Sequence, residues 1–105
     1  MQTFGEFWPY YLNEHKKPLT RALHFTGTSL SLLILVSAIA LGRPAFLLAG
    51  LVCGYAFAWV GHFFVEHNRP ATFKYPLWSF RADFKMLGCA LTGRLGAELQ
   101  RAGVS

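Results

Sequence analysis

The sequence predicts an all-α membrane protein: a transmembrane helical hairpin with an N-terminal interfacial amphipathic helix and a third, shorter C-terminal helix. Two apolar runs, residues 23–41 and 45–65, contain no Lys, Arg, Asp or Glu, and a helix needs about 20 such residues to cross the bilayer core. The composition agrees, because 53% of the residues are hydrophobic and 14% charged, against about 45–50% and about 25% in soluble domains. A chain of 105 residues is too short to close a β-barrel alone, so helices must satisfy its backbone in lipid. We expect residues 1–105 to form a single membrane domain.

Residues 3–15 are expected to form the interfacial amphipathic helix. Large apolar and aromatic side chains recur on one face at helical spacing, namely Phe4, Phe7, Trp8, Tyr11 and Leu12. Trp and Tyr favour the membrane interface, where the ring is buried and the polar tip stays hydrated. Pro9 interrupts the pattern and favours a helix start at that residue, since proline is tolerated in a first turn. His15 falls on the same face, at the end of the helix.

The two apolar runs form the predicted hairpin. A basic break at residues 16–21 precedes the first span, residues 23–41. The tight turn Gly-Arg-Pro at residues 42–44 leads into the second span, residues 45–66. Since the turn is so short, the two spans must run antiparallel.

The C-terminal third of the chain is more polar. Residues 68–76 are expected to form a loop, because two prolines interrupt them. Residues 77–93 are expected to form a helix that either lies flat in the interface or is partly inserted. The remaining residues predict a polar tail.

The distribution of basic residues predicts the orientation. Seven of them flank the outer ends of the two spans: Lys16, Lys17, Arg21, Arg69, Lys74, Arg81 and Lys85. Only Arg43 lies in the turn. Because cytoplasmic segments carry an excess of Lys and Arg, we expect an integral protein of a bacterial inner membrane with both termini in the cytoplasm. The net charge of +5 suits nucleic acid or an anionic membrane surface, and the apolar content favours the membrane over nucleic acid.

Three histidines are predicted to meet at one membrane face. His24 lies near the start of the first span and His62 near the end of the second, with His15 just before the hairpin. Glu66 follows His62 by four residues and would share its helix face. A single interfacial histidine is usually just hydrated or hydrogen-bonded, but three from separate segments favour a metal site. His67 is five residues from His62, so it turns off that face and is expected to be a solvated helix-end residue.

These ligand types allow more than one metal. Two His with one carboxylate is the arrangement of non-haem Fe(II) oxygenases, and three His also suit zinc. We expect His15, His24 and His62 to be the metal ligands. Glu66 would be either a further ligand or the acceptor that orients His62.

Other polar residues carry weaker signals. Arg69 and Lys74 could receive a substrate carboxylate, although basic residues on the cytoplasmic side need no substrate to explain them. Asp83 lies between Arg81 and Lys85 and is expected to form an interfacial ion pair with them.

Two stretches of the chain carry a family pattern, YYLNEHKKPLTRALHFTGT (residues 10–28) and WVGHFFVEHNRPATFKYPLWSFRADFKM (residues 59–86). They contain Y-L-x-x-H, R-x-x-H-x-x-G and G-H-x-x-x-E with a following P-A. The matching residues are Tyr11, Leu12, His15, Arg21, His24, Gly27, Gly61, His62, Glu66, Pro70 and Ala71. Over roughly residues 5–90 the chain resembles the 2-hydroxy fatty acid dioxygenase-like family, small multi-pass membrane proteins long catalogued as a domain of unknown function.

The resemblance implies an iron-dependent dioxygenase. Fungal members of the family shorten a 2-hydroxy fatty acid by one carbon, a form of α-oxidation. The resemblance therefore implies Fe(II) as the cofactor, the matched histidines as its ligands, and a lipid or fatty-acyl substrate and dioxygen as partners. The membrane would serve as the substrate reservoir.

Two other functions stay open at this point. His24 and His62 on facing spans could ligate a haem axially. A non-enzymatic hairpin that shapes the bilayer or binds a partner would hold no stoichiometric metal. In either case a homo-oligomer could bury the polar face of so small a hairpin.

Overall fold

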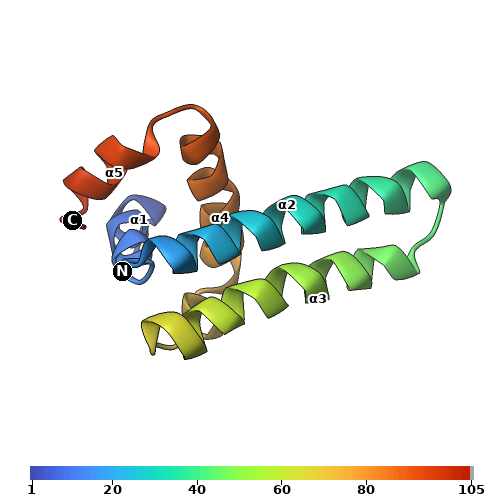
Figure 1. The fold of residues 1–105 in the computed structure, drawn as a ribbon, viewed down its shortest axis with the longest axis horizontal. Coiled ribbons are helices and arrows are strands. Elements are labelled where there is room, and N and C mark those ends of the chain that lie inside the picture. The colour runs from blue at the N-terminus through green and yellow to red at the C-terminus, as the bar shows by residue number, and fades with distance from the viewer. Residues whose placement is uncertain (105) are drawn as a thin grey trace.

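The computed structural model describes residues 1–104, and these residues form helices and no strand (Figure 1). The elements in order are α1 (Phe4–Asn13), α2 (Pro18–Leu41), α3 (Ala45–Val60), the π-helix η1 (Gly61–Glu66), the 3₁₀-helix η2 (Ala71–Phe73), α4 (Pro76–Leu91) and α5 (Leu95–Arg101). The prediction of an all-helical fold is confirmed for this part of the chain.

Helices α2 and α3 form a long antiparallel hairpin (Figure 1). Its turn begins at Gly42, which ends α2 with the left-handed backbone conformation (φ 62°) that glycine adopts at little cost. Helix α2 and the continuous segment Ala45–Glu66 are each long and apolar enough to cross a membrane. The second has the predicted bounds, whereas the first starts at Pro18 because proline, with its fixed φ, is well suited to the first helical position.

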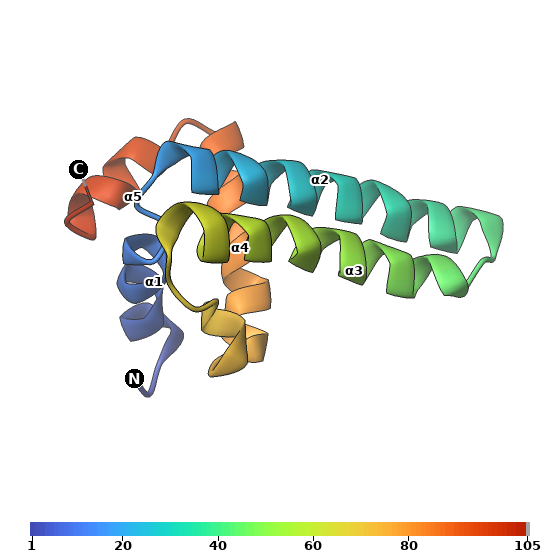
Figure 2. The same cartoon turned by 60° about the horizontal axis from the view of Figure 1, so that its bottom comes forward.

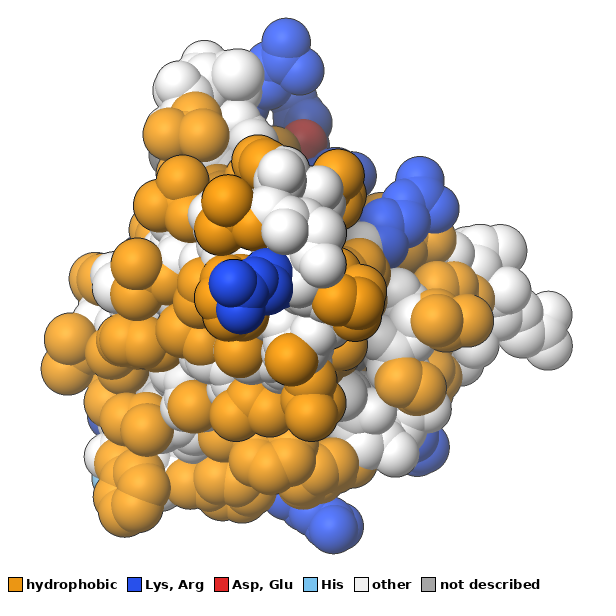
Figure 3. All heavy atoms as spheres, turned by 90° about the vertical axis from the view of Figure 1, so that its right-hand side faces the viewer, with side chains coloured by type: hydrophobic (Ala, Val, Ile, Leu, Met, Phe, Trp, Pro, Cys, Tyr) orange, Lys and Arg blue, Asp and Glu red, His pale blue; other side chains and the backbone are white. Residues whose placement is uncertain are grey.

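The outer surface of the hairpin is apolar. Many of its large aliphatic side chains point away from the protein, and Ile39, Leu48 and Leu33 are 79%, 67% and 66% exposed. Viewed onto the tip of the hairpin, hydrophobic side chains cover most of the visible face (Figure 3). Such a contiguous apolar surface is typical of a segment that another apolar phase covers.

Helix α1 has the predicted amphipathic face, but this face packs against protein. Phe7, Trp8, Tyr11 and Leu12 are all buried and join one cluster with residues of α4. Pro9 lies inside the helix, not at its start, because Thr3 caps the true N-terminus by accepting a hydrogen bond from the Glu6 backbone N–H at 3.2 Å.

Helix α4 crosses the open end of the hairpin, and α5 folds back beside α1 (Figures 1 and 2). The bounds of α4, Pro76–Leu91, are close to the predicted 77–93. The prediction of a polar tail is wrong, since Leu95–Arg101 is a helix. Leu95, Leu99 and Ala102 recur at helical spacing and pack against the main cluster. Both termini lie at the end of the molecule opposite the hairpin turn (Figure 1).

Candidate metal centre

Three buried imidazoles meet at the open end of the hairpin, where it packs against α1 and α4. His15 follows α1, His24 lies in the second turn of α2, and His62 lies in η1. They are 0%, 4% and 2% exposed. One nitrogen of each ring lies within 4.8 Å of the others, and the Nε2 atoms of His15 and His24 are 3.0 Å apart. The structure therefore brings together all three residues that the sequence predicts as metal ligands.

The tautomer of His15 follows from its neighbour. Its Nδ1 lies 2.6 Å from the backbone carbonyl of Tyr11. A carbonyl oxygen can only accept, so Nδ1 donates the proton and Nε2 keeps its lone pair. The backbone carbonyl of His15 in turn accepts from Arg21 Nη1 at 2.7 Å, which fixes the loop between α1 and α2.

The orientation of His62 is set by Asn68. Their Nδ1 and Oδ1 atoms are 2.7 Å apart. The Asn68 amide nitrogen donates to the backbone carbonyl and the carboxylate of Glu14, at 3.0 and 2.7 Å. These two bonds place the amide oxygen toward His62, so the imidazole donates from Nδ1 and again keeps a lone pair on Nε2.

A carboxylate lies beside His24. The Nδ1 atom of His24 is 3.5 Å from Asp83 Oδ1, and the Tyr11 hydroxyl donates a short hydrogen bond to the same carboxylate oxygen. Burial, and then the charge of Asp83, raises the pKa of Tyr11 well above 10, so its hydroxyl stays protonated and donates. His24 Nδ1 makes no hydrogen bond within the described residues, and the Asp83 carboxylate is the charge beside it. That charge would favour a proton on Nδ1 and leave the Nε2 lone pair to face His15.

This arrangement suits a cation. With the proton of His24 on Nδ1, beside Asp83, the Nε2 lone pairs of His15 and His24 would face each other at 3.0 Å and favour a cation between them. Burial, and then the neighbouring charges of His24 and His62, lowers the pKa of His15 well below 6.5, so a proton is disfavoured there. Two nitrogen ligands about 2.1 Å from one ion and at right angles would lie about 3.0 Å apart. The histidines line a cavity of about 10 Å³, about the room of one water-sized sphere, so these residues fit a metal ion.

Glu66 lies outside this cluster. Its carboxylate accepts hydrogen bonds from the Lys17 backbone N–H at 2.6 Å and the Thr20 hydroxyl at 2.7 Å, which cap the start of α2. The expected four-residue relation to His62 assumes an α-helix, whereas residues 61–66 form the wider turn of a π-helix. Asn68 takes the orienting position at His62 that the sequence suggested for Glu66.

Three other residues that the sequence singled out lie at the surface. His67 is exposed and ends η1 with a left-handed backbone (φ 60°), as expected of a helix-end residue. Arg69 and Lys74 are exposed as well, with their charged groups 5.8 Å and 6.0 Å from the Phe73 and Tyr75 ring centres. Neither of these two basic residues lines the histidine cavity.

The expected ion pair of Asp83 with its basic neighbours is not formed. Arg81 and Lys85 instead lie over aromatic rings of α1, with Arg81 Cζ 4.0 Å from the Phe4 centre and Lys85 Nζ 4.4 Å from the Trp8 ring. Asp83 is on the inner side of α4, one residue after the fully buried Ala82. It thus lies on the same side of α4 as the buried positions 79, 82 and 86.

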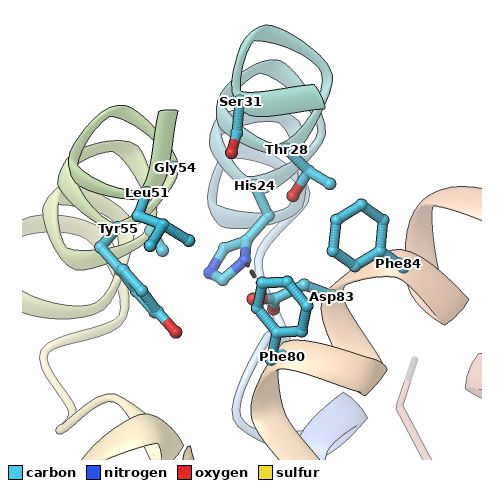
Figure 4. A pocket seen from close by; sticks show the side chains of 10 residues that line it. His24, Thr28, Ser31, Leu51, Gly54, Tyr55, Phe80, Asp83 and Phe84 are labelled. Atoms are coloured by element: carbon cyan, nitrogen blue, oxygen red, sulfur yellow. Dashed lines mark ion pairs between the residues drawn. The ribbon is translucent and has the colours of Figure 1, made fainter. Parts of the chain in front are cut away.

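A second cavity adjoins the first. His24, Ala58 and Asp83 belong to both. Figure 4 shows how side chains of α2, α3 and α4 surround this space, with the His24–Asp83 pair at its base. Its lining combines hydroxyl groups with large apolar side chains: Thr28, Ser31 and Tyr55, and Leu51, Phe80 and Phe84.

These features define a class, a small helical protein with a buried three-histidine centre at the base of an apolar hairpin. The family model described as 2-hydroxy-palmitic acid dioxygenase Mpo1-like matches residues 1–95, and the chain belongs to this family. The resemblance seen in the sequence motifs is thereby confirmed. Searches of curated proteins and of solved structures gave no match.

Proposed function

We propose that the chain is an iron-dependent membrane dioxygenase that shortens a 2-hydroxy fatty acid by one carbon. The family description names a dioxygenase of 2-hydroxy-palmitic acid. The observation that carries the proposal is the convergence of three buried imidazoles, two of which direct their other nitrogen at a protein acceptor. Metal-binding histidines typically have such acceptors.

A bound Fe(II) would supply the redox chemistry with dioxygen, which zinc lacks. Around it, Tyr11 and Asn68 hold His15 and His62 in one tautomer and orientation, and the Asp83 carboxylate lies 3.5 Å from His24 Nδ1. Their burial keeps bulk water away, which protects reactive species from side reactions. The net reaction balances: one 2-hydroxy acid and one dioxygen give the acid one carbon shorter, carbon dioxide and water.

The surroundings of the centre support a lipid substrate. The hairpin surface is apolar, and the centre lies at its base, where a headgroup would meet water if the hairpin is inserted. The adjoining cavity, with its hydroxyl and aromatic lining, extends from His24 between the helices (Figure 4). An acyl chain directed from the centre toward Leu51 and Phe80 would match this lining, since both of these residues are partly exposed at the surface.

Haem ligation is less well supported. The Nε2 atoms of His15 and His24 lie 3.0 Å apart. The cavity that the three histidines line has a volume of only about 10 Å³. The rings of His24 and His62, the two axial ligands of the haem hypothesis, have centres only 5.2 Å apart, which is too close for a porphyrin between them.

The test uses the full chain, purified in detergent without oxygen and loaded with Fe(II). On addition of 2-hydroxyhexadecanoate and air we expect oxygen uptake and pentadecanoic acid as product. Hexadecanoate, which lacks the 2-hydroxyl, is the control substrate and should give neither. Iron-loaded protein that converts no 2-hydroxy acid of any chain length would contradict the proposal.

A further inference from the structure

Ser79 carries a buried hydroxyl with no partner. The residue is 2% exposed and its Oγ makes no hydrogen bond within residues 1–104. Two helical threonines, Thr26 and Thr92, bond back to carbonyls four residues earlier at 2.9 and 2.8 Å, but Ser79 does not use the equivalent carbonyl of Tyr75 in this way. An unpaired buried hydroxyl is costly, so its persistence points to a ligand.

The hydroxyl belongs to the metal centre by position. Ser79 lines the same small cavity as the three histidines and Asp83. It precedes Asp83 by four residues on α4 and therefore shares its helix face. The second buried atom without a partner, His24 Nδ1, lines the cavity too. Two buried polar atoms of the cavity, one on α2 and one on α4, thus lack a hydrogen-bond partner among the described residues.

The charges around Ser79 select the kind of oxygen that it can bind. The nearby Asp83 carboxylate would repel a second carboxylate, whereas a neutral hydroxyl can both donate and accept. We propose that Ser79 binds the 2-hydroxyl group of the substrate and so distinguishes 2-hydroxy acids from plain fatty acids. This inference rests on the proposed function, and it makes Ser79 a specificity residue.

Binding measurements on the metal-loaded protein, without oxygen, test this role. The ligands are 2-hydroxyhexadecanoate and hexadecanoate, and the proteins are the wild type, Ser79→Ala and Ser29→Ala. Ser29 is an exposed serine of α2, so it controls for the chemical change. Loss of one hydrogen bond should weaken binding of the 2-hydroxy acid roughly 3- to 10-fold in Ser79→Ala and leave hexadecanoate unchanged. Ser79→Cys, a weaker donor of similar size, should fall between.

A second readout separates ligand binding from a structural role. Because the hydroxyl has no partner in the ligand-free protein, Ser79→Ala should unfold at the same or a higher temperature than the wild type. If Ser79→Ala keeps the preference for the 2-hydroxy acid, or weakens both acids equally, the assignment of Ser79 is overturned and the proposed function stands. If the wild type binds neither acid, both are overturned.

Discussion

The chemistry of this protein depends on which nitrogen of each histidine carries the proton. A backbone carbonyl, an amide and a carboxylate lie at the Nδ1 atoms of His15, His62 and His24. The hydrogen bonds of His15 and His62 favour a proton on Nδ1 and leave Nε2 for a metal. The charge of Asp83, 3.5 Å from His24 Nδ1, favours the same tautomer there. The acceptors come from α1, from the loop after η1 and from α4, so the whole base of the fold contributes to one small site.

Asp83 is expected to support metal binding through His24. Asp83→Asn keeps the size of the side chain and removes its charge, so we expect metal affinity to fall about 10- to 100-fold. Glu66→Gln is the matched control, because the same chemical change occurs outside the cluster, on the carboxylate that caps α2. Titration against a chelator of known affinity measures the metal affinity of both variants. Equal losses in the two variants would contradict the role given to Asp83.

At the residue scale the sequence was enough to predict that the three histidines meet, but not which groups lie beside their rings. The three histidines could be predicted because an antiparallel hairpin places the outer ends of its spans together. Asn68 and Asp83 could not, because their positions depend on the π-helix at residues 61–66 and on the way α4 crosses the hairpin. Glu66 shows the same limit, since its expected face assumed a regular α-helix.

Among the elements, α2 and α3 depend most on close backbone contact. A Cβ atom built on Gly27 would lie 2.5 Å from Phe57 Cβ and 3.2 Å from the Gly54 carbonyl oxygen. Neither neighbour is the flexible end of a side chain. A Cβ on Gly54 or Gly61 would also be tight, 3.3 Å from Ser31 Cβ and 3.1 Å from Thr20 Cγ2 of α2. Glycines therefore set the separation of the hairpin near the three histidines.

Substitution of Gly27 should therefore force the two helices apart. We expect Gly27→Ala to destabilise the protein by about 1–3 kcal/mol, the usual range for overpacking. Gly88→Ala in α4 meets no atom within 4 Å and should be neutral or slightly stabilising, since alanine is the better helix former. Thermal unfolding in detergent compares the stability of the two variants with that of the wild type. A Gly27→Ala protein as stable as Gly88→Ala would refute the close packing.

The charge-free runs predicted the two long helices, and the aromatic spacing predicted the buried face of α1. What α1 covers was not predictable, because the same apolar face suits lipid or protein, and here it packs on α4. Helix α5 was missed because it is only seven residues long and contains a glycine, although Leu95 and Leu99 lie four residues apart.

As a whole, the molecule has two unlike ends. Both termini lie with the metal centre at one end and the hairpin turn lies at the other (Figure 1). That the termini are cytoplasmic and Arg43 lies on the far side of the membrane stays a prediction.

Cysteine labelling in intact cells measures that topology. In a background with Cys53 and Cys89 replaced by alanine, a membrane-impermeant reagent should label Arg43→Cys from outside. It should label Gln2→Cys, at the exposed N-terminus, only after permeabilisation. Labelling of Arg43→Cys only after permeabilisation would exclude this orientation.

The central claim is that the three histidines hold one metal ion, and metal analysis of the purified chain tests it most directly. Protein prepared without oxygen should contain about one iron per chain. His24→Ala and His62→Ala should contain none, because each loses a direct ligand, and His67→Ala should match the wild type, because His67 is exposed outside the cluster. Stoichiometric metal in both His24→Ala and His62→Ala would contradict the account.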